Sequence, residues 1–291
     1  MYPAPFEYHA PATVAEALAL LDKLGDDAKV IAGSMSLVPL MKFRLATPGY
    51  LVDLRKVPGM SGVSQVGDSL QIGALTTHRQ METDALVRAK LPMMSEAAAQ
   101  IGDAQVRNMG TMGGSLAHAD PSADWPAVTT ALGATVHLVS KKGERAVPIE
   151  AFILGPLTTA LEPGELIHKI SVPLHGKHAG SAYEKLPHPA SRFAVVGVAA
   201  VVVLDKGGVV TSARVAITGL GPKAARAAAV ESALQGKQAG AAELRAASAH
   251  TTHGLELQDD LLGTAAWRGH MAAVYAERAL VRAVERARKN S

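Results

Sequence analysis

Cysteine is absent from this chain of 291 residues. Without a thiol the chain forms no disulfide, offers no thiolate to zinc and has no cysteine nucleophile. It also cannot hold an iron–sulfur cluster through cysteine. Any cluster chemistry connected with this protein would therefore have to belong to another polypeptide.

Aromatic residues are scarce and charge is low and balanced. Aromatics make up 4% of the chain, and 29 Lys+Arg against 26 Asp+Glu leave a net charge of +3. A nucleic-acid platform of basic residues and stacking rings is therefore not expected. Hydrophobic residues reach 48%, which excludes a disordered chain, and the length corresponds to about two domains.

Long hydrophobic runs are also lacking. The longest, AVVGVAAVVVL at residues 194–204, is too short to span a bilayer. The first ten residues have no positively charged segment of the kind that opens a secretory signal. We therefore expect no membrane insertion and a cytoplasmic protein.

The periodicity predicts an α+β protein. Thr13 and Glu16 have capping-box spacing before an amphipathic helix, and the first segment reads as a small βαβ layer. Further predicted strands are 30–32, 51–54, 70–75, 135–139, 146–149, 182–186, 193–204 and 209–219. Predicted helices are 37–45, 86–101 with an interruption at Pro92, 125–132, and several from 223 onward, whereas 102–122 reads as a loop.

Two loops rich in small residues are candidate anion sites. Loop 1 is defined as residues 32–37 (AGSMSL) and follows a predicted strand, and loop 2 as residues 110–115 (GTMGGS). Small residues let unpaired backbone amides approach a phosphate, so the two loops could hold one pyrophosphate between them. Neither loop matches the Rossmann or P-loop fingerprint, so each could also be only a tight turn.

Asp120 and Asp124 follow loop 2 around a predicted helix start. A carboxylate there could bind a sugar hydroxyl, and Asp120 or Ser122 could equally be only a helix cap. Five basic residues near the end of the last helix read as a solvated face or as a contact with another subunit: Arg278, Arg282, Arg286, Arg288 and Lys289.

Residues 111–127, TMGGSLAHADPSADWPA, closely resemble the flavin-binding loop of the FAD subunits of molybdenum hydroxylases. These are the medium subunits of the carbon-monoxide dehydrogenase and xanthine dehydrogenase family. Loop 1 lies where this family has A-G-G-x-S-L. Residues 6–21, 181–199 and 265–283 also resemble the family, so the resemblance covers nearly the whole chain.

The resemblance implies a two-part FAD-binding domain of the vanillyl-alcohol-oxidase type, followed by a smaller domain of antiparallel sheet and helices. The corresponding division is 1–176, with parts of about 1–55 and 56–176, and then 177–291. Loops 1 and 2 would hold the pyrophosphate, Asp124 would bind polar groups of FAD, and Ile101 and Ile167 would pack near it. Lys185 and Phe193 would lie near the flavin ring. The implied cofactor-binding set is Ala32, Gly33, Ser34, Met35, Ser36, Leu37, Ile101, Thr111, Gly113, Gly114, Ser115, Asp124, Ile167, Lys185 and Phe193.

Loop 1 departs from the family pattern, since Ser34 replaces a glycine and Met35 a polar residue. A serine would be strained if the position needs a positive φ. We therefore expect loop 2 to be the better match of the two.

The resemblance also implies a function. The chain would pass electrons from two [2Fe-2S] clusters on a small subunit through FAD to an external acceptor, with molybdopterin on a large subunit and the assembly doubled into a heterohexamer. No residue of this chain need then be catalytic, and no metal is expected in it. A stand-alone flavin oxidase and a non-enzymatic nucleotide-binding module are the alternatives. The hydroxylated substrate and the final acceptor are not encoded in this chain.

Overall fold

The N-terminal part is a small parallel sheet with two helices. The computed structural model describes residues 2–290, and its first three strands pair in the order β1-β3-β2. Thr13 caps α1 by accepting a hydrogen bond from the Glu16 amide, as the capping-box spacing predicts. The elements are β1 (Glu7–His9), α1 (Val14–Leu24), η1 (Gly25–Asp27), β2 (Ala28–Ile31), α2 (Leu37–Lys42), β3 (Tyr50–Asp53) and η2 (Leu54–Lys56).

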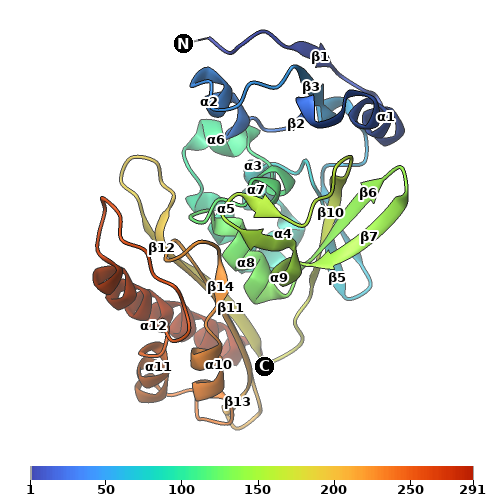
Figure 1. Ribbon diagram of the computed structural model, residues 1–291. Helices are drawn as coiled ribbons and strands as arrows, with labels where there is room; N and C mark the ends of the chain where they lie inside the picture. Colours follow the sequence, from blue (N-terminus) through green and yellow to red (C-terminus); the bar gives the residue numbers. More distant parts are fainter. Residues whose placement is uncertain (1, 291) are drawn as a thin grey trace.

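The middle part combines a five-stranded antiparallel sheet with short helices (Figure 1). The strands pair in the order β4-β5-β10-β6-β7. They are β4 (Val63–Val66), β5 (Ser69–Gly73), β6 (Thr135–Ser140), β7 (Gly143–Pro148) and β10 (Leu166–Pro173), and a small ladder joins β8 (Ile153–Gly155) to β9 (Thr158–Thr159). The helices are α3 (His78–Thr83), α4 (Ala85–Lys90), α5 (Pro92–Gln100), α6 (Ala104–Met109), α7 (Met112–His118), α8 (Asp124–Leu132) and α9 (Ile149–Phe152).

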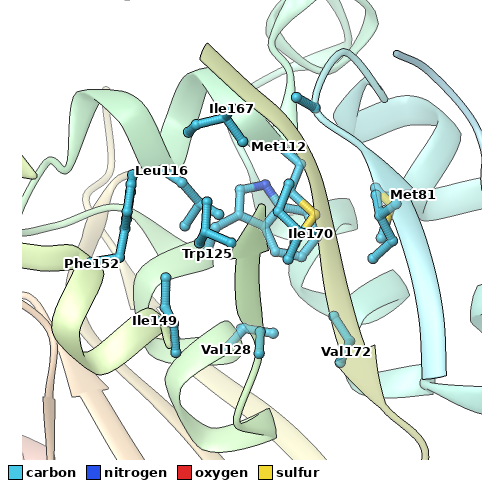
Figure 2. Packing of buried hydrophobic residues seen from close by; sticks show 14 of the residues in the cluster. Met81, Met112, Leu116, Trp125, Val128, Ile149, Phe152, Ile167, Ile170 and Val172 are labelled. Atoms are coloured by element: carbon cyan, nitrogen blue, oxygen red, sulfur yellow. The ribbon is translucent and has the colours of Figure 1, made fainter. Parts of the chain in front are cut away.

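The core of this part forms where the sheet meets α7 and α8. Trp125 and Phe152 are fully buried, and Met112, Leu116 and Ile170 pack with them (Figure 2). Burial of such side chains contributes about 1.5–3 kcal/mol each. The core therefore fixes α7, whose first turn carries loop 2.

The C-terminal part is an antiparallel sheet covered by helices. Its strands pair in the order β11-β12-β13-β14, and α12 packs on β11 and β12 (Figure 1). Because α8 packs on the same sheet, β12 is buried almost throughout, which explains its continuous apolar sequence. The elements are β11 (Ala179–Pro187), β12 (Ala194–Leu204), β13 (Val210–Thr218), β14 (Ala225–Arg226), α10 (Ala228–Leu234), α11 (Ala241–Ser248) and α12 (Ala265–Lys289).

Two of the basic residues of α12, Arg282 and Arg286, join the two halves of the molecule. Arg286 donates to Glu96 of α5 at 3.0 Å and to the Ser181 carbonyl at 2.6 Å, and Arg282 pairs with Glu96 at 3.2 Å. Neither reading offered by the sequence describes these two arginines, because their partners lie within the chain. Within residues 2–290, no helix is long and apolar enough to cross a membrane.

One segment was predicted wrongly, and several elements were not predicted, among them β4, α3 and β10. Residues 102–122, predicted as a loop, contain α6 and α7, with Asp103 and Thr111 as their N-caps. Two adjacent glycines in α7 disfavour a helix, but packing on the core outweighs this propensity. The central strand β10 was not predicted, because His168 and Lys169 interrupt its apolar alternation at a register shift.

Candidate cofactor site

A cleft of about 730 Å³ opens between the N-terminal sheet and the helices of the middle part. Loops 1 and 2 both line it, together with Asp124 and residues of several further elements, among them α1, α3 and β10. A cleft of this size lies in the range typical of cofactor and ligand sites. Two loops that are more than 70 residues apart in sequence therefore meet at one site, as the sequence analysis expected.

Loop 1 presents backbone amides without partners. It runs from the end of β2 into α2, and Ser36 gives α2 no side-chain cap. Within residues 2–290, the amides of Gly33, Ser34, Met35, Ser36 and Leu37 donate no hydrogen bond. Since backbone donors are seldom left unpaired, a run of five marks a place where an anion could accept them.

Ser34 confirms that this position requires a left-handed backbone. Its φ is 66°, in the region that favours glycine. The Ser34 hydroxyl donates to the Ala32 carbonyl at 3.3 Å, which is a weak local bond. The serine therefore keeps the loop conformation at some cost in backbone strain.

Loop 2 differs from loop 1 in its backbone hydrogen bonds. The Met112 amide donates to the Thr76 carbonyl and the Gly113 amide to the Ala74 carbonyl, both at 2.9 Å. The Thr111 hydroxyl accepts from the Gly114 amide at 3.1 Å. The expectation of unpaired amides is therefore correct for loop 1 and wrong for the amides of 112–114 in loop 2.

The glycines of the site have different neighbours. A Cβ on Gly33 would lie 2.2 Å from the Met109 carbonyl oxygen, and one on Gly113 would lie 2.7 Å from the Ala74 carbonyl oxygen. A Cβ on Gly114 would meet only the Thr111 hydroxyl, at 2.8 Å, and Gly114 is exposed in the cleft. The first two glycines allow close packing of the backbone, whereas Gly114 keeps the cleft open.

Asp124, at the start of α8, lies in a buried network beside the cleft. Its Oδ1 accepts from the Tyr183 hydroxyl at 2.5 Å, and its Oδ2 accepts from Lys185 Nζ at 2.9 Å. Lys185 also donates to the Gln100 carbonyl at 3.2 Å. Burial raises the pKa of Asp124 and lowers the pKa of Lys185, while their mutual attraction opposes both shifts.

Two comparisons with known families identify this arrangement. The family described as the FAD binding domain in molybdopterin dehydrogenase matches residues 4–175, and the CO dehydrogenase flavoprotein C-terminal domain matches residues 181–283. The chain belongs to the FAD-binding subunit family of molybdopterin dehydrogenases. The resemblance, the two-domain FAD-binding fold and the oxidoreductase class predicted from the sequence are thereby confirmed.

Two relatives of this family match along nearly their whole length. The carbon monoxide dehydrogenase medium chain of Hydrogenophaga pseudoflava is 40% identical over 280 residues, which cover 96% of this chain and 97% of the relative. The 6-hydroxypseudooxynicotine dehydrogenase complex subunit alpha of Paenarthrobacter nicotinovorans is 38% identical, over 99% of this chain and 97% of the relative.

Solved structures of relatives have the same fold. A carbon monoxide dehydrogenase from Hydrogenophaga pseudoflava, solved without the Mo-pyranopterin moiety of its molybdenum cofactor, superposes with a TM-score of 0.94 at 42% identity. The alignment covers 98% of this chain and 99% of that one. Quinoline 2-oxidoreductase from Pseudomonas putida 86 gives a TM-score of 0.93 at 33% identity, with 99% of each chain covered.

The structure brings together all the predicted FAD-binding residues except one. Ile101 follows α5, Ile167 belongs to β10, and Phe193 precedes β12, with 43% of its surface exposed; all three line the cleft with loops 1 and 2. Lys185 does not line it, because its side chain is fully buried against Asp124. Its predicted position near the flavin ring stays a prediction.

Sequence reasoning missed other residues that line the cleft, including His78 and Arg192. His78 gave no signal, because the Thr77–Gln80 capping box that surrounds it explains the local sequence fully.

Proposed function

We propose that this chain binds one FAD non-covalently in the cleft and serves as the electron-transfer subunit of a molybdenum hydroxylase complex. The observation that carries the proposal is the run of five unpaired amides in loop 1. These amides line the same cleft as Gly114, which leaves space there because it has no side chain. Unpaired amides and low bulk are what a pyrophosphate needs. The residues present therefore fit the FAD that the family binds.

Each part of the cleft would have its own task. The loop 1 amides would bind the pyrophosphate, and loop 2 would leave it room at Gly114 and Ser115. Asp124 is held by Tyr183 and Lys185 and would accept from FAD hydroxyls through its remaining lone pairs.

The flavin ring would lie against apolar side chains. Ile101, Ile167 and Phe193 line the cleft and would exclude water from the ring. FAD, when bound, takes up electrons singly and releases them as a pair. This chain's residues bind and orient it, and none of them needs to be a catalytic acid or base.

The partners follow from what the chain lacks. With no cysteine, it cannot supply a Cys-ligated iron–sulfur relay. The relatives bear names such as medium chain and complex subunit. We therefore propose a small [2Fe-2S] subunit that delivers electrons, a large molybdopterin subunit, a heterohexameric assembly, a cytoplasmic location and an external electron acceptor.

Purification of the tagged chain from its native host tests this proposal. We expect two co-purifying subunits, iron and molybdenum in the preparation, and one FAD per chain that heat or acid releases completely. Recovery of a lone flavoprotein that oxidises a substrate without iron or molybdenum would favour the stand-alone oxidase. A colourless chain that cannot be reconstituted with FAD would favour the nucleotide-binding module.

A further inference from the structure

His78 is a buried histidine on the wall of the cleft with no task in the function proposed above. It is the first residue of α3, only 5% of its surface is exposed, and it lines the cleft. Its backbone amide donates to the Gly110 carbonyl at 2.9 Å. The residue is therefore fixed directly to the segment that opens loop 2.

Trp125 decides which ring nitrogen of His78 carries the proton. The indole Nε1–H can only donate, and it lies 3.0 Å from His78 Nδ1. Nδ1 must therefore be the acceptor, which leaves the proton of the neutral ring on Nε2. Burial, together with the charge of Arg107, lowers the pKa of His78 to about 4, so the ring is neutral near pH 7. Trp125 is fully buried and packed among the core side chains (Figure 2).

The Nε2–H donor has no acceptor among residues 2–290. No hydrogen bond joins Nε2 to these residues, and it is not one of the orphaned atoms that are shut off from solvent. Gly110 provides the space beside it, since a Cβ there would lie 2.7 Å from Nε2. A Cβ on Gly33 of loop 1 would lie 2.7 Å from the Gly110 Cα. The free donor is thus next to the place where loop 1 reaches the segment that opens loop 2.

We propose that His78 Nε2–H donates a hydrogen bond to an oxygen of the bound pyrophosphate, and that Trp125 is the positioning residue that holds the ring in this tautomer. The inference rests on the proposed FAD site. A neutral donor is sufficient here because five unpaired amides of loop 1 already line the same cleft. A hydrogen bond is also stronger when the oxygen that accepts it is anionic.

Two substitutions of similar size separate the two ring nitrogens. In His78→Gln the amide nitrogen reaches the place of Nε2, so the donor is kept. In His78→Asn the amide reaches only the place of Nδ1, so Trp125 keeps an acceptor but the cleft loses its donor. For the full chain freed of FAD, we expect His78→Asn to weaken FAD binding about tenfold, and His78→Gln to change it less than about threefold.

ADP and riboflavin show which part of FAD accepts the bond. ADP carries the pyrophosphate without the flavin, so His78→Asn should weaken ADP as much as FAD. Riboflavin carries no phosphate, so its affinity should not change. Equal affinities of wild type and His78→Asn for ADP would overturn the inference. A wild-type chain that binds neither FAD nor ADP would overturn the proposed function and this inference together.

Nuclear magnetic resonance of the ¹⁵N-labelled imidazole gives a readout on the wild-type chain that does not depend on variants. We expect the Nε2–H tautomer without ligand, and a downfield shift of this proton with slower exchange once ADP binds. A proton on Nδ1, or an Nε2–H signal that ADP leaves unmoved, would contradict the assignment.

Discussion

Loops 1 and 2 look alike in sequence and are built in opposite ways. Loop 1 leaves the amides of residues 33–37 unpaired and holds Ser34 at a φ of 66°. Loop 2 pairs its amides with carbonyls of residues 74 and 76 and with the Thr111 hydroxyl. The first loop offers donors, and the second offers a packed backbone with one open position at Gly114.

This difference shows that a loop of small residues can contribute to an anion-binding site in two ways. Gly33 of loop 1 lets the backbone pack against Met109, because a Cβ there would lie 2.2 Å from the Met109 carbonyl oxygen. This packing brings the unpaired amides into the cleft. In loop 2, Gly113 lets α7 pack on Ala74, and Gly114 leaves space in the cleft. The loop that departs from the family pattern is thus the one that carries the donors.

The largest expected effect concerns the buried ion pair between Lys185 and Asp124, the residue that lines the cleft together with loop 2. Lys185→Met removes the cation and leaves Asp124 without its charged partner, since Lys185 Nζ lies 2.8 Å from its Oδ1. Breaking such a pair costs about 3–5 kcal/mol, and removing both charges is far milder. We expect urea unfolding to show this loss in Lys185→Met and to show most of it restored in Asp124→Asn/Lys185→Met.

The double variant is the control in this cycle. If it is as unstable as the single variant, the two charges do not act together and Lys185 has another role. Tyr183 remains in both proteins, so any difference between them reports on the charge pair.

Identical substitutions at neighbouring positions of loop 2 should have different effects. Gly113→Val places a branched side chain against the Ala74 backbone, and we expect it to lower the free energy of unfolding by about 3 kcal/mol. Gly114→Val fills the cleft instead, so we expect a folded protein whose FAD affinity falls about 100-fold. Urea unfolding and FAD titration measure the two effects. Wild-type affinity in Gly114→Val would remove loop 2 from the site.

Most of the element order could be predicted from the sequence, and the difference between the loops could not. The break at Pro92 and the cap at Thr13 are local signals, and both were predicted correctly. The partners of the loop 2 amides come from residues 74 and 76, which lie more than 30 positions away and have no pattern that points to loop 2. Lys185 was placed by resemblance alone, which gives the neighbourhood of a residue but not its burial.

The dependence of stability on pH tests His78, the histidine that lies next to both loops. The pKa of His78 is about 4 in the folded chain against 6.5 for an unperturbed histidine, so between these values the unfolded chain binds more protons. Stability is therefore unaffected above pH 6.5 and falls as the pH drops toward 4. At pH 5 the loss from His78 is about 2 kcal/mol. We expect wild type to lose this much more than His78→Gln between pH 7 and pH 5.

His175 and His137 also have lowered pKa values, because both are partly buried. Their effect is common to wild type and His78→Gln, so it cancels in the comparison. If both proteins lose stability equally, His78 is protonated in the folded chain and cannot be locked in one neutral tautomer.

The smallest expected effect is on loop 1. Ser34→Gly removes the strain of a side chain at a φ of 66° while keeping the amide, and we expect a gain of about 1 kcal/mol in unfolding free energy. Arg44→Gly is the matched control, because Arg44 is exposed, has a φ of 58° and lies outside the cleft. Both variants should become more stable in urea, but only Ser34→Gly should change FAD binding, toward equal or tighter affinity. Weaker binding in Ser34→Gly would mean that loop 1 serves FAD through the serine hydroxyl, and the contrast between the two loops would then no longer rest on unpaired amides.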